Sequence, residues 1–434
     1  MSPTFASLSI RNYRIYATGS LVSNVGTWMG RVGQDWLVLT VLTNHSSTAL
    51  GFVTGLQFLP FLLLAPFTGA IADRFPKRRI LFCSQSALAL SALVLATLTL
   101  TGVVQLWHVY AVALFQGVAT AVDNPARQTF VSEMVPRQQL SNAVGLNSAS
   151  FNAGRLLGPG IAGLVIAGVG TGLALLLNGL SFFFVLASLA SMHTDELNPV
   201  PTSRGRGQVR EGFAYVRSRP DLMLLMGLVF VLGTFGMNFQ ITTALMATQA
   251  FHKGPTEYGL LGSIMAIGSL AAALLAARRK NPRLLVVVVA LAGFTVATAV
   301  ASIAPTYDLF ALSLVPVGLF ALTAMNTANS TVQLSVDPQV RGRVMSLYMA
   351  ILMGGTPIGS PLIGWIGDHA GPRWTIGVGS IAVGLSLAVV AVVFLRSGRV
   401  RIAVERADTA RLPRLRLVRR PVTAPVIPEP EAVR

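Results

Sequence analysis

Charge is scarce in this 434-residue sequence. Only 11% of the residues are Asp, Glu, Lys or Arg, whereas 53% are hydrophobic, and the mean hydropathy is +0.65. Water-soluble domains carry about 25% charged residues, so the composition excludes an ordinary soluble protein. The single cysteine, Cys83, lies in an apolar run, which excludes a disulfide framework.

Sequence motifs for catalysis are also missing. The chain has no Walker P-loop, so direct use of ATP is excluded, and it has neither a nucleophile elbow nor a pair of catalytic carboxylates. The five histidines are scattered rather than clustered: His45, His108, His193, His252 and His369. The sequence therefore predicts that the protein is not an enzyme and that it needs no metal and no cofactor.

Long apolar runs take up most of the chain instead. Each is about as long as the roughly 20 residues that cross a bilayer as a helix, and none shows the short alternating pattern of a β-barrel strand. We predict an all-α membrane protein with twelve transmembrane helices. Their approximate spans are 15–43, 48–72, 80–102, 107–131, 139–168, 170–191, 221–250, 256–278, 283–303, 307–332, 341–367 and 373–396.

The basic residues collect in alternate connections between these runs. With a cytoplasmic N-terminus, most of the 33 lysines and arginines fall on the cytoplasmic side, as the positive-inside rule requires. We predict a multi-pass protein of the bacterial cytoplasmic membrane with both termini in the cytoplasm. The net charge of +17 then reflects topology and needs no nucleic-acid partner.

A polar segment divides the apolar runs into two sets of six. We predict an N-terminal six-helix bundle over residues 1–191, a cytoplasmic linker over 192–220 and a C-terminal six-helix bundle over 221–396. The Arg- and Pro-rich tail, 397–434, is predicted to be disordered and held at anionic lipid headgroups by its charge. A regulatory or partner-binding tail is the alternative.

The two sets of six also share residues at equal spacing, which indicates a parallel repeat typical of secondary transporters. The matched pairs are Asn124 with Asn326, Thr129 with Thr331, Pro136 with Pro338, and Pro159 with Pro361.

A charged turn follows the second apolar run, where residues 69–79 read GAIADRFPKRR. Gly69 allows a neighbouring helix to approach closely, and the Asp73 carboxylate can bind an arginine or the N-terminus of a helix. We predict that Gly69, Asp73, Arg74 and Arg78 form a gate that holds two helices together at the cytoplasmic face. The alternative is that the charges only orient the protein.

This turn resembles the signature loop of the major facilitator superfamily, Gly-x-x-x-Asp-Arg-x-Gly-Arg-Arg/Lys, with Pro76 where the family usually has glycine. Stretches at 124–159 and 341–361 resemble the branch of that superfamily that contains enterobactin exporters and macrolide-efflux proteins. The resemblance covers about 10–396. It implies a secondary transporter built of two six-helix bundles.

The fifth run carries Gly154, Gly158, Pro159 and Gly163. They resemble the antiporter signature of the same superfamily, Gly-x-x-x-Gly-Pro-x-x-Gly-Gly, with Ala162 in place of one glycine. This resemblance implies an exporter that exchanges its solute for protons. Close helix packing alone is the alternative explanation of the glycines.

Three charged residues lie deep inside predicted helices. Arg31 and Asp35 are four residues apart, hence on one face of the first helix, and Arg155 lies in the fifth. Because charge within a membrane is costly and usually functional, we hypothesise that Asp35 carries the transported proton and that Arg31 or Arg155 tunes it. A permanent salt bridge is the alternative. Two arginines against one carboxylate favour an anionic or neutral solute.

Two further charged pairs are candidate gates. Asp123 and Arg127 lie four residues apart at the cytoplasmic end of the fourth helix, where a simple helix-end ion pair is the alternative. The spacing of the charged turn recurs at 364–373, which contains Asp368 and Arg373. We predict that this copy forms a second gate, on the outer face.

Aromatic and amide side chains within the predicted helices suggest a large amphipathic cavity. We predict a proton-coupled exporter of a small amphipathic molecule, such as a drug or a siderophore, that acts as a monomer. An importer or uniporter of the same fold and a non-transporting membrane scaffold or sensor are the alternatives. The predicted cavity residues are Trp28, Trp36, Phe58, Phe235, Asn238, Phe239, Gln240, Asn326, Asn329 and Tyr348.

Overall fold

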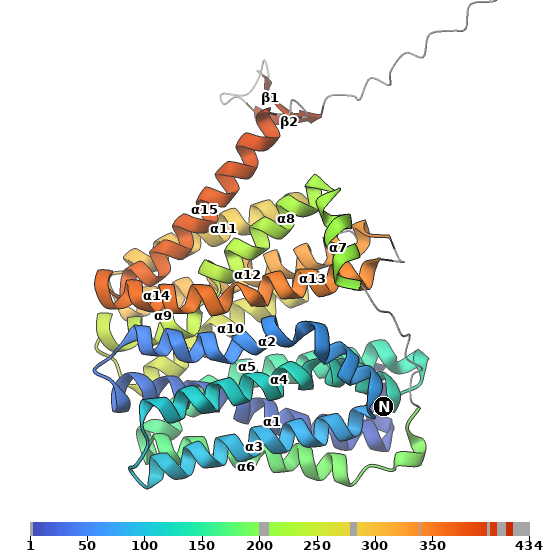
Figure 1. Cartoon of the computed structure of the whole chain (residues 1–434). Coiled ribbons are helices and arrows are strands. Elements are labelled where there is room, and N and C mark those ends of the chain that lie inside the picture. The colour runs from blue at the N-terminus through green and yellow to red at the C-terminus, as the bar shows by residue number, and fades with distance from the viewer. Residues whose placement is uncertain are drawn as a thin grey trace, which may run out of the picture. The chain divides into compact units, whose positions relative to one another are not determined.

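Long helices run side by side through most of the protein (Figure 1). The computed structural model describes residues 3–198, 208–277, 284–337, 340–396, 400–405 and 414–419. Residues Met1–Gly384 form one compact unit and Leu385–Arg434 another. The long helices of the N-terminal half are α1 (Arg11–Trp36), α2 (Ser47–Arg74), α3 (Lys77–Leu100), α4 (Leu106–Met134), α5 (Leu140–Val169) and α6 (Thr171–Ala190).

The C-terminal half has more elements because two of its predicted spans are interrupted. The seventh span consists of α8 (Pro220–Val231), a π-helical turn at Leu232–Gly236, α9 (Phe239–Leu245) and a second π-helical turn at Met246–Ala250. The eleventh span is split at Gly355 into α13 (Arg341–Gly354) and α14 (Thr356–Ala370). The other helices are α10 (Pro255–Ala277), α11 (Leu284–Ile303), α12 (Tyr307–Ser335) and α15 (Pro372–Arg396).

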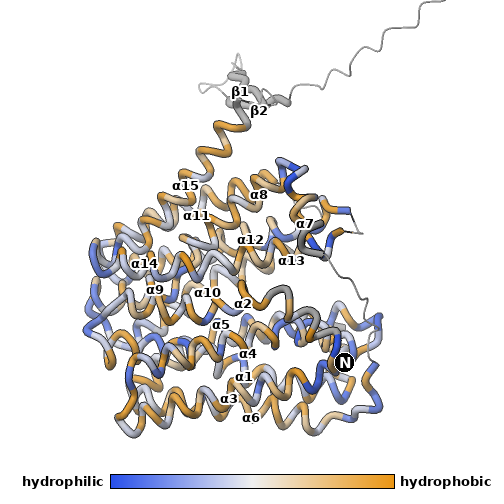
Figure 2. The backbone as a smooth tube through the Cα atoms, viewed as in Figure 1, coloured by the Kyte–Doolittle hydropathy of each residue, from blue (hydrophilic) through white to orange (hydrophobic). Residues whose placement is uncertain are grey.

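The apolar helices confirm the prediction of an all-helical membrane protein. By length and composition, 10 segments of the described chain could cross a membrane. The two remaining predicted spans are α1 and α4. Helix α1 packs against α5 and α6, and α4 packs against α2 and α3, so both lie among the apolar helices. Figure 2 shows hydrophobic residues along the helices and hydrophilic residues gathered at their two ends.

The two ends of the helices differ in their turns. We call the end with the α2–α3 turn (residues 74–79) the basic end. The turns at the opposite end contain the residues with positive φ, namely His45, Gly102, Gly170, His252 and Gly371. Gly102, Gly170 and Gly371 have φ of 74°, 90° and 94°, a conformation in which glycine carries no steric penalty. Short left-handed turns thus close the hairpins at the opposite end.

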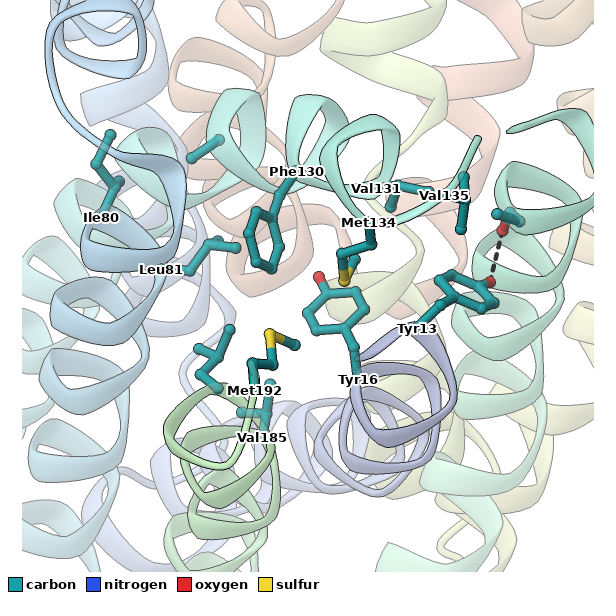
Figure 3. Close-up of a cluster of buried hydrophobic side chains, with 13 residues drawn as sticks. Tyr13, Tyr16, Ile80, Leu81, Phe130, Val131, Met134, Val135, Val185 and Met192 are labelled. Carbon is teal, nitrogen blue, oxygen red and sulfur yellow. Dashed lines mark hydrogen bonds between the residues drawn. The ribbon is translucent and has the colours of Figure 1, made fainter. Parts of the chain in front are cut away.

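A cluster of buried aromatic and aliphatic side chains holds the N-terminal half together near the basic end (Figure 3). Tyr13 is fully buried, and its hydroxyl donates a 2.7 Å hydrogen bond to the carbonyl oxygen of Ala143 in α5. The ring of Tyr16 meets that of Phe130 in α4 edge-on, with 5.7 Å between centroids. These contacts tie α1 to both α4 and α5.

The main contacts between the two halves are made by α2 and α5. Helix α2 packs against α13 and α14, and α5 packs against α10. Glycines permit the close approach: a Cβ added to Gly259 would lie 2.2 Å from the carbonyl oxygen of Pro159, and one added to Gly51 would lie 2.4 Å from that of Ser360. Larger side chains at these positions would force the halves apart.

The predicted linker contains a short helix, α7 (Gln208–Arg217), which packs against α13. Val216 is buried, and the Tyr215 hydroxyl donates a 3.3 Å hydrogen bond to Asp337. The linker therefore contributes a docked helix.

The tail contains two strands, β1 (Val400–Glu405) and β2 (Arg414–Arg419), which pair antiparallel. The sequence predicts a disordered tail, whereas these two segments pair, and three of the six residues in each are Val, Ile or Leu. The remaining tail residues lie outside the described part of the chain.

Candidate functional site

A small cavity lies between the two halves. Its volume is about 50 Å³. The N-terminal half contributes Trp28, Arg31, Val32, Asp35, Arg155 and Pro159, and the C-terminal half contributes Phe239, Gln240, Thr243, Tyr258, Gly262 and Met265. The structure therefore brings the three charged residues proposed for proton coupling into one site.

Asp35 connects the two halves at this site. Asp35 is 5% exposed, and its carboxylate accepts a 3.0 Å hydrogen bond from the hydroxyl of Tyr258, near the start of α10. The ring of Tyr258 also stacks on Trp36, with 6.2 Å between centroids and 21° between planes. Because Asp35 lies near the end of α1 and Tyr258 near the start of α10, these contacts join the two halves on the side of the opposite end.

The two arginines of the cavity rest on one aromatic ring. The guanidinium carbon of Arg31 lies 4.9 Å from the centroid of the Trp28 ring, and that of Arg155 lies 5.8 Å from it. Arg31 and Asp35 share a helix face, yet they are not among the ion pairs of the described residues, which reach to 4.0 Å. Asp35 thus has Tyr258 as its hydrogen-bond donor, in place of the salt bridge considered from the sequence.

The glycines of α5 serve two different neighbours. Gly154 and Gly158 face α1, since an added Cβ would lie 2.9 Å from the backbone of Asn24 and 2.5 Å from the Cβ of Trp28, respectively. Gly163 faces α10, where an added Cβ would lie 2.5 Å from the carbonyl oxygen of Pro255. The antiporter-like motif therefore packs α5 against both α1, which carries Asp35, and α10, which carries Tyr258.

Asp368 forms a second polar connection between the halves, at the opposite end. It lies at the end of α14, and its carboxylate accepts hydrogen bonds from the backbone N–H groups of Ser47 and Thr48 at 2.7 and 3.0 Å. The hydroxyls of Ser46 and Ser47 also donate to it. A carboxylate at this position satisfies unpaired donors of the first turn of α2 and interacts favourably with its helix dipole.

Gly364 allows this contact, because an added Cβ would lie 2.3 Å from the carbonyl oxygen of Ser47. Gly364, which permits close approach, and Asp368, which caps α2, occupy the positions of glycine and aspartate in the spacing that recurs at 364–373. The structure thus places Asp368 at an interface between the halves, where the sequence predicted an outer gate.

Arg78 and Arg373 occupy equivalent places within their own halves. Arg78 donates from Nε to the carbonyl oxygen of Leu189, at 2.7 Å, near the end of α6. Arg373 donates from one terminal nitrogen to the carbonyl oxygen of Ala304, at 2.6 Å, just after α11. Each arginine therefore satisfies carbonyl groups at the C-terminus of a neighbouring helix, and neither touches the other half through these bonds.

The contacts of Asp123 and Lys77 at the basic end also lie inside the N-terminal half. Asp123 is 3% exposed and accepts 2.7 Å hydrogen bonds from Arg127 in α4 and from Ser84 and Gln85 in α3. Lys77 forms a 3.3 Å ion pair with Glu133. The Asp123–Arg127 pair therefore links α3 to α4 in this conformation.

The predicted cytoplasmic gate also includes Arg74, Asp73 and Gly69. Arg74 is exposed, and its guanidinium lies 5.8 Å from the centroid of the Phe75 ring. The side chain of Asp73 and the surroundings of Gly69 lie outside the described part of α2.

Only some of the predicted cavity residues line the cavity. Trp28, Phe239 and Gln240 do. Trp36 packs on Tyr258, and Phe58 pairs with Phe61. The other five lie elsewhere in the C-terminal half: Phe235 and Asn238 near the break between α8 and α9, Asn326 and Asn329 on α12, and Tyr348 in the core, where its hydroxyl donates to the carbonyl oxygen of Met325.

Sequence reasoning missed the partners of the two bridging carboxylates. Tyr258 is one aromatic residue in an apolar run, and Ser46, Ser47 and Thr48 look like an ordinary helix start. The serine and threonine residues before α2 were a usable signal, because such residues mark a helix N-terminus that a carboxylate can approach. Nothing in the sequence pattern singles out Tyr258.

A larger apolar groove of about 490 Å³ lies between α2, α3 and α4, away from the cavity between the halves. Its lining is almost entirely aliphatic and aromatic, and Phe75 and Phe115 are half exposed. Since it contains none of the buried carboxylates, we place the candidate site at the smaller cavity.

Known proteins resemble this chain over most of its length. A family model described as "transmembrane secretion effector", of the major facilitator type, matches residues 2–424. The staphyloferrin A transporter of Staphylococcus aureus is 25% identical over 88% of this chain and 95% of its own. The multidrug efflux pump Tap of Mycolicibacterium fortuitum is 27% identical over 86% and 93%, and macrolide efflux protein A of Streptococcus pyogenes 22% identical over 81% and 89%.

Solved structures share the fold. A bacterial homologue of the human lysosomal transporter Spinster, in an inward-facing and unoccupied conformation, superimposes with a TM-score of 0.71 and 13% identity, covering 91% of this chain and 98% of its own. A variant of the nucleoside transporter NupG superimposes with a TM-score of 0.72 and 12% identity, covering 88% and 100%. At these identities the likeness concerns the fold alone.

Proposed function

Because the chain belongs to the transmembrane secretion effector family of the major facilitator superfamily, we propose that it exports a small amphipathic molecule in exchange for protons. Relatives named as efflux pumps support export as the direction. The clustering of arginines supports a cytoplasmic position for the basic end and for both termini. Alternating access would then rock the two halves about the cavity.

The hydrogen bond between Asp35 and Tyr258 carries the proposal of proton coupling. It joins the two halves across the cavity, so it must break when the opposite end opens. Burial favours the neutral carboxyl group, whereas the tyrosine hydroxyl favours the ionised form. When Tyr258 moves away, Asp35 loses the hydrogen bond that favours its ionised form. Proton binding to Asp35 can therefore be coupled to the choice between two conformations.

The two copies of the charged spacing would act as alternating latches. In this conformation Asp368 holds α14 to α2 at the opposite end. When that end opens and the basic end closes, Asp73 would perform the equivalent task, binding the N-terminus of α13. Substrate would enter the cavity from the basic end, and the latches would prevent both ends from opening together.

The test uses inverted membrane vesicles from cells that overproduce the protein, with the lumen acidified by respiration. We expect the vesicles to accumulate fluorescein. Nigericin and valinomycin with potassium, which together collapse the pH gradient and the membrane potential, should abolish this uptake. The Asp35→Asn protein should lose gradient-driven uptake by at least about a hundredfold, whereas Asp308→Asn, at an exposed carboxylate, should transport normally.

Full gradient-driven uptake by Asp35→Asn would show that another group carries the proton. Uptake that persists when both the pH gradient and the membrane potential are collapsed would contradict antiport, and extrusion from the vesicles would indicate an importer.

A further inference from the structure

The two arginines of the cavity share one nearby carboxylate, Asp35, and neither is paired with it directly. Neither the Arg31 nor the Arg155 side chain makes a hydrogen bond or an ion pair with any part of the chain that the structure describes. Asp35 lies on the face of Arg31, but the hydrogen bond that it accepts comes from Tyr258. Two positive charges therefore share a confined space with one carboxylate.

Placing two positive charges in this cavity costs free energy, and binding of an anion would offset that cost. A charge within a membrane protein needs a counter-charge or water, and two guanidinium groups near one ring repel each other. The ring of Trp28 offsets part of this cost through cation–π attraction. It also holds both guanidinium groups beside the cavity, and both side chains remain partly accessible there.

The cavity has room for a small acidic group. Its volume of about 50 Å³ is close to that of one or two water molecules, which also suits a carboxylate. Guanidinium groups bind carboxylates through two parallel hydrogen bonds. Across the cavity, Gln240 of the C-terminal half supplies an amide that can also donate.

We propose that Arg31 and Arg155, held by Trp28, bind the carboxylate of an organic anion, and that organic anions are the substrate class of this transporter. The inference rests on the proposed function, since it assumes that the cavity carries the substrate. The rest of the molecule would extend from the carboxylate toward the basic end. The positive pair repels cations, so it excludes cationic compounds of similar shape.

Export of an anion also moves charge in a favourable direction. With a negative cell interior, the membrane potential drives an anion outward by about 2.3 kcal/mol per charge for each 100 mV. Exchange of an anion for a proton is therefore electrogenic, and valinomycin with potassium, which abolishes the potential, should slow it.

The experiment compares two dyes with related ring systems and opposite charge, fluorescein and rhodamine 123. Binding is measured by fluorescence anisotropy on the purified full-length protein at pH 8, and transport is measured in inverted vesicles. We expect saturable binding and uptake of fluorescein but not of rhodamine 123. Replacing Arg155→Gln should weaken fluorescein binding about ten- to a hundredfold, whereas Arg155→Lys, which keeps the charge, should lose less than about tenfold.

The matched control is Arg217→Gln, which removes an arginine from the exposed face of α7 and should bind fluorescein like the parent protein. Size-exclusion profiles and melting temperatures show whether each variant is folded. Since Arg155→Gln removes an unpaired charge, we expect it to melt no lower than the parent.

The outcomes separate this inference from the proposed function. Fluorescein binding that depends on Arg155 without any transport would support the anion site and contradict export. Export of rhodamine 123 that ignores Arg155 would support export and overturn the anion site. The inference is also overturned if the folded protein binds no fluorescein, or if Arg155→Gln binds it as tightly as the parent.

Discussion

The two ends of the molecule use similar residues for different purposes. At the opposite end, Asp368 crosses from one half to the other and caps α2. At the basic end, the described ion pairs of Lys77 and Asp123 join helices of the N-terminal half only. The same spacing of glycine, aspartate and arginine occurs at both ends. The described contacts therefore join the two halves at the opposite end through Asp368.

The arginines of the two copies have the same role at both ends. Arg78 and Arg373 bind the C-terminal carbonyl groups of α6 and α11 in the same way, although they lie at opposite ends. Each arginine thus stabilises its own half, and at the opposite end Gly364 and Asp368 contact the other half. This division of tasks lets the two halves separate at one end without losing their internal structure.

The largest effect is expected from a side chain at Gly364. A Cβ there would lie 2.3 Å from the carbonyl oxygen of Ser47, so Gly364→Leu should keep α14 from reaching α2. We expect uptake of fluorescein by inverted vesicles to fall by about a hundredfold or more, because one of the two states is lost.

Gly168→Leu in α5 is the matched control, because an added Cβ there meets no atom within 4 Å. Equal transport by the two variants would contradict close contact of α14 and α2 as a step in the cycle.

A smaller effect, on stability rather than on gating, is expected at the basic end. Asp123 accepts three hydrogen bonds in a buried network, so Asp123→Asn should lower the free energy of unfolding by about 3 kcal/mol. Thermal unfolding in detergent measures this loss.

In the Asp123→Asn protein, the distance between the two halves at the opposite end, measured between spin labels, should be unchanged. A protein that stays stable but changes its open and closed populations would identify Asp123 as a gate residue instead.

The smallest effects should be equal at the two ends. Arg78→Gln and Arg373→Gln each remove hydrogen bonds to helix C-terminal carbonyl groups, so each should cost about 1 kcal/mol of stability. Chemical unfolding of both variants beside Arg217→Gln measures the difference. If one variant alone is destabilised, the two copies are not equivalent in structure.

Much of the fold follows from composition and periodicity. Apolar runs of membrane length predict the helices, because a backbone in lipid must satisfy its own hydrogen bonds. The interruptions were not predicted, although the break at Gly355 has a signal in the sequence, because Gly354, Gly355 and Pro357 interrupt the run there. The π-helical turn at Leu232–Gly236 packs closely against this segment: an added Cβ at Gly359 would meet the carbonyl oxygen of Thr234.

The candidate site could be predicted only in part. Buried charge is rare enough that Asp35, Arg31 and Arg155 stand out in the sequence. Their partners depend on how α1 is placed against α10, which no local pattern encodes, so Tyr258 was missed and a salt bridge was considered instead. The large cavity expected from ten side chains is a small one in this conformation, lined by three of them. Tyr348 illustrates the reason, since an aromatic residue on a membrane helix packs equally well in a core.

The central claim is that the halves are joined at one end or at the other, with Asp368 holding the opposite end. Double electron–electron resonance on spin-labelled pairs tests it directly in a protein whose native cysteine is replaced by Cys83→Ser. One pair, Asn44→Cys with His369→Cys, reports the opposite end, and another, Gln138→Cys with Ser218→Cys, reports the basic end. All four positions are exposed.

We predict that adding Asp368→Asn lengthens the distance of the first pair and shortens that of the second. Distances that both lengthen, or that both stay unchanged in the folded protein, would contradict the claim.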